Sequence, residues 1–156
     1  MPKAPIRRAG RRDTGPGEFV VELDEQTRGL VRQLCDELDG LLDTDSPLLA
    51  RLFPPPYGDD RERNEGYSAL AGPELIESRR TGIETVRRTV DREWLDEDEL
   101  MAWMRALNDI RLVLGTLLGI SDDSDEPEVP DDKVQTLGVY EFLGALLEMT
   151  VQALAS

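Results

Sequence analysis

Histidine is absent from the 156 residues of this chain, and cysteine occurs once, at Cys35. The lack of histidine excludes Ser-His-Asp triads and Cys-His pairs. It also excludes zinc and transition-metal sites built from the usual nitrogen and sulfur ligands. A single cysteine cannot form an internal disulfide. We therefore expect no enzymatic activity, no cofactor and no metal. The remaining carboxylates, arginines and apolar residues are typical of an interaction protein.

Long apolar runs are also missing, and aromatic residues make up only 5% of the chain. No run approaches the ~20 apolar residues that span a bilayer. The basic N-terminus is not followed by the apolar stretch of a secretory leader, because Glu22 and Asp24 interrupt the segment that begins at Phe19. A lone cysteine fits the reducing cytosol. We therefore expect a cytoplasmic protein that does not contact membranes.

Negative charge dominates the chain, with a formal net charge of −15. Residues 1–12 differ, because they hold five basic side chains and no acidic one (Lys3, Arg7, Arg8, Arg11 and Arg12). The rest of the chain holds 13 basic and 33 acidic side chains. A body this acidic repels the phosphates of nucleic acid and favours solubility and basic protein partners.

Helical periodicity dominates the sequence after residue 23. Residues 1–17 are rich in proline, glycine and arginine and predict a disordered basic arm. Residues 19–23 alternate like a short strand, which packs as an extended lead-in or pairs with a second chain. Apolar spacing and caps predict helices over residues 24–43, 46–53, 73–92, 96–118 and 133–154. Together these predict an all-α fold, a single-domain bundle of about five helices over residues 18–156.

Local signals set the ends of these helices. The proline run 54–56 ends the second helix, and residues 57–72 are expected to form a polar loop. Asp96 and Glu99 predict a capping box, and Gly119 predicts a left-handed helix end. The acidic linker, residues 121–132, lacks the spacing of an EF-hand, so we expect a solvated loop there and no calcium site.

Arg111 lies among apolar positions of the helix expected over 96–118. A buried guanidinium needs a carboxylate or several carbonyl partners, because an unpaired buried charge is costly. Glu141, which interrupts the apolar last helix, is the candidate partner. One interpretation is a buried ion pair that sets helix register, and the other is an anion or substrate site. The frequency of such pairs in bundle cores favours the first.

Eight arginines form a candidate surface for nucleic acid or a protein partner. Four lie in the arm and four on one face of the helix expected over 73–92 (Arg7, Arg8, Arg11, Arg12, Arg79, Arg80, Arg87 and Arg88). Glu77, Glu84 and Asp91 lie three or four residues from helical arginines, so much of that charge is expected to be neutralised within the helix. A helix-turn-helix is disfavoured, because residues 96–99 would bring four acidic side chains to the DNA.

Cys35 shares a helical face with Val31, Leu38 and Leu42. This position predicts a core thiol, and a reactive thiol is the weaker redox alternative. The last helix, residues 133–154, is apolar almost all round. Such a helix is either central in the bundle or buried by a partner subunit, so we expect a homodimer through it.

Three segments in this order are similar to a known family: SPLLARLFPPPY (46–57), LNDIRLVLGTLLGI (107–120) and YEFLGALLEMTVQAL (140–154). The chain resembles an actinobacterial family of unknown function, whose short cytosolic helical proteins are often encoded beside the ClpS protease adaptor. Some members are described as AosR-type oxidative-stress transcriptional regulators. The resemblance covers most of residues 18–156. It implies regulation through protein contacts, with the transcription or proteolysis machinery as partner.

A redox sensor that uses an intramolecular dithiol needs two cysteines, whereas Cys35 is alone here. Redox control would then act between chains or not at all. We interpret the chain as a cytosolic regulatory or adaptor protein of transcription or stress. The alternative is a direct DNA-binding regulator that uses the arm and the arginine-rich helix face. A carboxylate-based enzyme is the weakest reading, because no pair of carboxylates is evident across a pocket.

Overall fold

The computed structural model describes residues 3–120 and 129–156. These residues are mostly helical and also form three short strands. In chain order the elements are β1 Ile6–Arg8, β2 Phe19–Val21, α1 Glu25–Leu41, η1 Pro47–Leu49, α2 Arg61–Thr89, β3 Trp94–Leu95, α3 Glu97–Leu118, η2 Asp131–Lys133 and α4 Val134–Ala155. The helical class is therefore confirmed. The details differ from the expectation, because the described residues hold four α-helices, two 3-10 turns and a small sheet.

The sheet joins the N-terminal residues to the helices. β2 lies between β1 and β3, and both pairings are antiparallel, with Ile6 opposite Val21 and Phe19 opposite Leu95. These four side chains are buried in the main core. The disordered arm expected over residues 1–17 is therefore wrong for residues 6–8, and β2 needs no second chain to pair. Ile6 is the one apolar side chain of β1, which is too short a signal to detect in sequence.

Helix caps appear where the sequence places them. The carboxylate of Asp24 accepts from the backbone N–H of Thr27 at 2.7 Å before α1. Asp96 and Glu99 form the expected capping box before α3, with bonds of 2.8 and 2.9 Å between each side chain and the other's backbone. Gly119 ends α3 in the left-handed region, at φ 73°. These predictions are confirmed because capping depends on residues three positions apart.

The long helix α2 departs most from the expectation. It begins at Arg61 and contains Pro73, so the loop expected over 57–72 is mostly helical. Asp60 caps the start of the helix: its carboxylate accepts from the backbone N–H of Arg63 at 3.2 Å. This cap was not predicted from the sequence. Pro73 is tolerated there because the surrounding turns are exposed, so water can bond the carbonyl that the proline leaves free.

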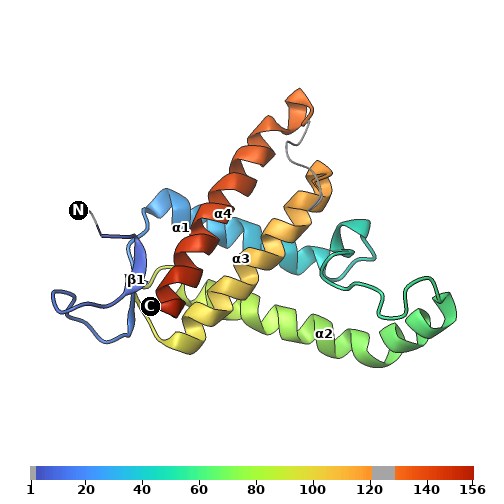
Figure 1. The fold of residues 1–156 in the computed structure, drawn as a ribbon, viewed down its shortest axis with the longest axis horizontal. Coiled ribbons are helices and arrows are strands. Elements are labelled where there is room, and N and C mark those ends of the chain that lie inside the picture. The colour runs from blue at the N-terminus through green and yellow to red at the C-terminus, as the bar shows by residue number, and fades with distance from the viewer. Residues whose placement is uncertain (1–2, 121–128) are drawn as a thin grey trace.

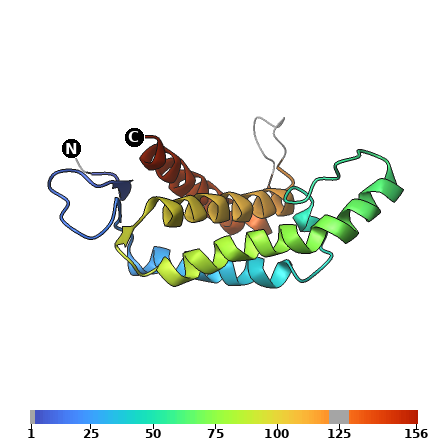
Figure 2. The ribbon, with the colours of Figure 1, turned by 90° about the horizontal axis from the view of Figure 1, so that it is seen from below.

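The core lies where α3 packs against α2 and α4, with α1 beside them (Figures 1 and 2). Trp103 of α3 is fully buried, and its indole N–H donates to the hydroxyl of Thr89 at 2.8 Å. The sheet lies at one end of the molecule, and the first half of α2 projects at the other (Figure 1). No residue of α2 before Ile83 is buried.

Candidate functional site

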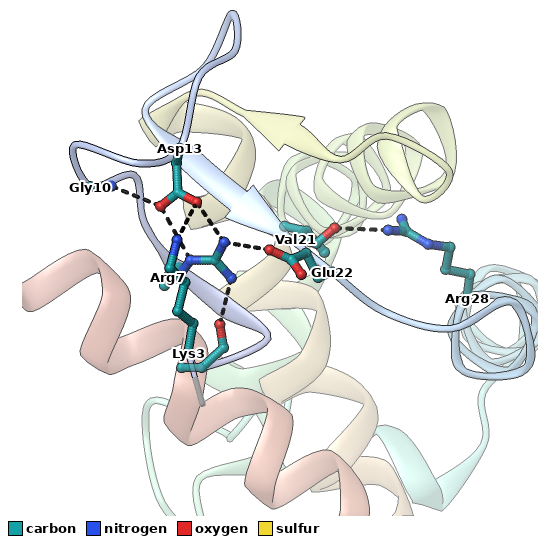
Figure 3. A network of polar contacts seen from close by, with 8 residues as sticks. Lys3, Arg7, Gly10, Asp13, Val21, Glu22 and Arg28 are labelled. Carbon is teal, nitrogen blue, oxygen red and sulfur yellow. Dashed lines mark hydrogen bonds and ion pairs between the residues drawn. The ribbon is translucent and has the colours of Figure 1, made fainter. Parts of the chain in front are cut away.

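The N-terminal arginines are held mostly by acids of their own chain. The Arg7 guanidinium donates to Asp13 at 2.7 Å and also to Glu22, and the backbone N–H of Gly10 donates to Asp13 at 2.9 Å (Figure 3). The bond from Arg7, followed by that from Gly10, holds the pKa of Asp13 well below its usual range. Arg7 therefore orders the loop between β1 and β2 and is not free to bind a ligand.

The other arginines of the arm differ in their surroundings. Arg8 lies 4.7 Å from the ring centroid of Phe19, and its Nε donates to the backbone carbonyl of Ser156 at 2.9 Å. Its ion pair with Glu18 is longer, at 3.7 Å. Arg11 and Arg12 are exposed on the loop between β1 and β2 and form no ion pair within residues 3–120 and 129–156. They are the arginines of the arm that still offer positive charge to a partner.

Arg28 of α1 was not recognised in the sequence as a structural residue. It is 8% exposed, and its guanidinium donates to four backbone carbonyls, those of Val21 (2.8 Å), Leu23 (2.9 Å), Val90 (2.5 Å) and Arg92 (3.0 Å). Figure 3 shows the bond to Val21. One side chain thus joins β2 to the end of α2. Its signal was the helical spacing to the buried positions Val31 and Cys35.

The arginine face of α2 is largely neutralised by carboxylates of α1 and of the turn that follows it. Arg80 pairs with Asp39 (3.1 Å) and Asp43 (2.7 Å). Arg87 contacts Asp36 (2.8 Å), Asp39 (3.2 Å) and, within its own helix, Glu84 (2.7 Å). The neutralisation expected within α2 is therefore correct only for Glu84. Arg88 is exposed and has no ion pair to a described residue.

Arg79, the fourth of these residues, points to α3 and pairs with Asp109 at 2.9 Å. The side chain of Asp109 is 3% exposed. Burial raises the pKa of this carboxyl to about 6, and the nearby positive charge of Arg79 opposes the rise. A polar hollow of about 370 Å³ borders the pair, with Arg105 and Asp98 in its wall. Asp109 interrupts the apolar stretch of α3, and this signal was missed.

Arg111 and Glu141 do not form the expected ion pair. Glu141 is exposed, whereas the Arg111 guanidinium lies over the ring of Tyr140, 4.4 Å from its centroid. The Nε of Arg111 is buried without a hydrogen-bond partner in the described part of the chain. Gly144 leaves the room for it, because a Cβ there would lie 3.2 Å from that Nε. The prediction failed because the rotation of α4 turns Tyr140, and not Glu141, toward α3.

Cys35 is fully buried, as expected of a core thiol. Burial raises the pKa of its thiol to about 12, and the positive charge of Arg87 only partly opposes this. The thiolate, which is the reactive form, is therefore scarce near neutral pH. No group of three or more possible metal-ligating side chains occurs within residues 3–120 and 129–156. Most of the acidic linker considered as a calcium loop, residues 121–128, lies outside the described residues.

An apolar groove separates the first half of α2 from the segment before it. It has a volume of about 730 Å³ and is lined by residues 42–56, including the proline run, and by one face of α2. Phe53, Tyr67 and Ile76 are among its apolar walls, and Asp45 is the charged residue that lines it. This groove was not expected, because residues 57–72 were predicted to form a loop, whereas most of them belong to the helix that forms one wall.

α4 is long and apolar, but it is not enclosed. The segment Asp131–Ala155 is long and apolar enough to cross a membrane by length and composition. Of its most apolar stretch of 18 residues, 22% is buried. No run of this length was expected from the sequence, so the segment departs from that expectation by length and composition. Core helices of water-soluble proteins meet the same criterion, and α4 packs against α3 and β1.

The fold and these surfaces define a small, mostly helical protein with an acidic body and two partly uncovered apolar surfaces. A family model described as a domain of unknown function (DUF2017) matches residues 5–154. The chain therefore belongs to the DUF2017 family, in agreement with the resemblance seen in its three motif segments. No solved structure matches it.

Relatives with an assigned name are mycobacterial. A protein of Mycobacterium leprae that bears the name AosR is 32% identical over 130 residues, which cover 70% of this chain and 59% of the relative. The oxidative stress regulator AosR of Mycobacterium tuberculosis H37Rv is 30% identical over 127 residues, which cover 69% and 58%. The chain thus matches about three fifths of the length of these relatives.

Proposed function

We propose that this chain is a cytoplasmic regulatory protein of a stress response, which acts by binding another protein and performs no enzymatic chemistry. The main support is the apolar helix α4, because only 22% of its most apolar 18-residue stretch is buried. The family relationship and the names of the mycobacterial relatives support a role in oxidative stress. Components of the transcription or proteolysis machinery are the partners that this role implies.

Oxidation of Cys35 is not the signal in this proposal. The thiol is enclosed by the core, and its raised pKa keeps it protonated. The chain would then transmit a signal through its affinity for the partner.

The experiment is a deletion of the gene in its source organism, followed by peroxide challenge and transcript measurement. We expect deletion to alter survival and stress transcripts, and both the wild-type gene and Cys35→Ala to restore them. Protein levels measured by immunoblot exclude loss of the variant as a cause. Unchanged transcripts and survival after deletion would contradict a regulatory role. A stable Cys35→Ala protein that fails to restore them would show that the thiol is required.

Direct DNA binding is the second candidate function, and it is favoured by one observation. Arg11, Arg12 and Arg88 are exposed and form no ion pair with a described residue. Three phosphate contacts predict a salt slope of only about −3, so the affinity would be weak. Fluorescence anisotropy with a labelled duplex at several salt concentrations tests this. Binding that Arg11→Ala/Arg12→Ala removes would favour DNA recognition, whereas no binding at low salt would reject it.

A further inference from the structure

The composition of α4 does not match its burial. Its buried residues are Leu143, Leu146, Thr150 and Ala153, which form one narrow line toward α3 and β1. The other side of the helix has no cover from the described part of the chain. Figure 1 shows α4 running beside α3. A helix that is apolar nearly all round is normally covered all round. The open side therefore fits a second molecule.

The open side of α4 has the shape of a helix-docking face. Val134 and Phe142 are 55% and 40% exposed, and the helical repeat places them within about 80° of each other around the axis. The small residues Gly138 and Ala145 lie on the same exposed side, seven residues apart. Small side chains let a second helix approach closely, because the interaxial distance depends on the side chains at the contact. Phe142 also borders a hollow of about 600 Å³ shared with Gly29 and Leu30 of α1. We call this surface the α4 face; it consists of Val134, Gly138, Glu141, Phe142, Ala145 and Glu148.

The charge on the α4 face has one sign. Glu141 and Glu148 are the charged side chains between Val134 and Ser156. Both are exposed, and neither forms an ion pair with a residue that the structure describes. The side-chain amide of Gln152 donates to Glu148 at 2.9 Å, which leaves the negative charge in place. Seven residues separate the two carboxylates, a distance of about 10 Å along a helix.

We propose that the α4 face binds a basic amphipathic helix of another protein. The apolar stripe of such a helix would cover Val134, Phe142 and Ala145, and lysine or arginine side chains at its edge would pair with Glu141 and Glu148. A second copy of this chain fits less well, because it would bring the same two acids and a further net charge of −15. An anionic membrane would repel the face, because membrane-binding helices need basic residues. This inference rests on the proposed function and specifies the class of partner.

The test uses the full chain and a synthetic helix of about three heptads with leucine at its apolar positions and lysine beside them. A twin peptide carries glutamate in place of lysine. Binding is measured by fluorescence anisotropy at two salt concentrations. Glu141→Gln/Glu148→Gln removes the two charges from the α4 face. Glu62→Gln/Glu65→Gln is the matched control, because it removes two exposed acids from the projecting part of α2.

We expect the lysine peptide to bind at least about tenfold more tightly than its twin, and Glu141→Gln/Glu148→Gln to weaken it about fivefold. The control variant should change affinity by less than about twofold. Equal weakening by both variants would overturn the proposal, because general negative charge would then explain the binding. Failure of the wild-type chain to bind the lysine peptide, or stronger binding to anionic vesicles, would also overturn it.

The homodimer expected from the sequence is a further outcome of this experiment. Light scattering gives the mass of the wild-type chain and of Ala145→Arg. A dimer that Ala145→Arg dissociates would make a second copy the occupant of the α4 face and overturn the proposal, whereas a monomer at all concentrations supports it. Failure of the peptide to bind would overturn the partner class but would not affect the transcript changes expected in the deletion strain. Unchanged transcripts would reject the regulatory role whatever the peptide does, so the two failures are distinguishable.

Discussion

Arg79 of α2 and Asp109 of α3 form an ion pair of 2.9 Å that joins two helices through a carboxylate with 3% of its side chain exposed. This is the kind of ion pair between helices that was expected of Arg111 and Glu141. Arg79 itself is 35% exposed, so solvent screens the pair from one side. Burial raises the pKa of Asp109 to about 6, which makes the strength of this contact depend on pH.

Arg79→Met should destabilise the protein more at pH 8 than at pH 5. At pH 8 it leaves an unpaired buried carboxylate, at a cost of about 2 kcal/mol. Without Arg79 the pKa of Asp109 rises further, so at pH 5 the carboxyl is protonated and the cost falls. Urea unfolding at both pH values measures the difference. An equal loss of stability at pH 5 and pH 8 would contradict this assignment.

Asp109→Asn should change how stability depends on pH. Because the pKa of Asp109 is raised in the folded state, the stability due to this group is present at low pH and is lost as pH rises through about 6. The free energy of unfolding of the wild type relative to Asp109→Asn should therefore decrease between pH 4 and pH 7. A constant difference across this range would mean that the carboxyl has an ordinary pKa.

Arg28→Ala should be among the most destabilising single changes in α1. It removes the donor for the backbone carbonyls of Val21, Leu23, Val90 and Arg92. We expect a loss of about 3 kcal/mol in the free energy of unfolding. Arg32→Ala is the matched control, because its 2.6 Å bond to Asp91 is exposed, and it should cost less than about 1 kcal/mol. Similar losses for the two variants would reject the role given to Arg28.

Two glycines of α4 should respond differently to substitution by alanine. A Cβ at Gly138 meets no heavy atom within 4 Å, whereas one at Gly144 lies 3.2 Å from the Nε of Arg111. Gly138→Ala should raise stability by about 0.5–1 kcal/mol through helix propensity. Gly144→Ala should lose that gain, because Arg111 must move from its place over Tyr140. Thermal unfolding compares the two variants, and equal stabilisation would show that Arg111 adapts without cost.

Cys35 should be unreactive in the folded protein. Its burial and its pKa of about 12 predict that a thiol reagent labels it only in molecules that have opened or unfolded. The labelling rate should therefore rise with urea and match the unfolding equilibrium. Rapid labelling in native buffer near neutral pH would show an open thiol and would restore Cys35 as a redox candidate.

The helix caps and the core cysteine could be predicted from the sequence because each depends on residues close along the chain. Asp96 and Glu99 lie three positions apart, and the face of Cys35 follows from the helical repeat in α1. The acidic body and the absence of histidine also needed no structure. The absence of histidine by itself excludes Ser-His-Asp triads and Cys-His pairs.

Contacts between distant segments were decided only by the tertiary structure. The rotation of each helix about its axis determines which charged side chains meet, so Arg79 pairs with Asp109 and Arg111 lies over Tyr140. Ile6 became part of a strand because β2 and the core offer it partners far along the chain. The first half of α2 lacks the apolar periodicity from which a helix could be predicted. The composition of α4 predicted a helix covered on all sides, whereas one side of it is open.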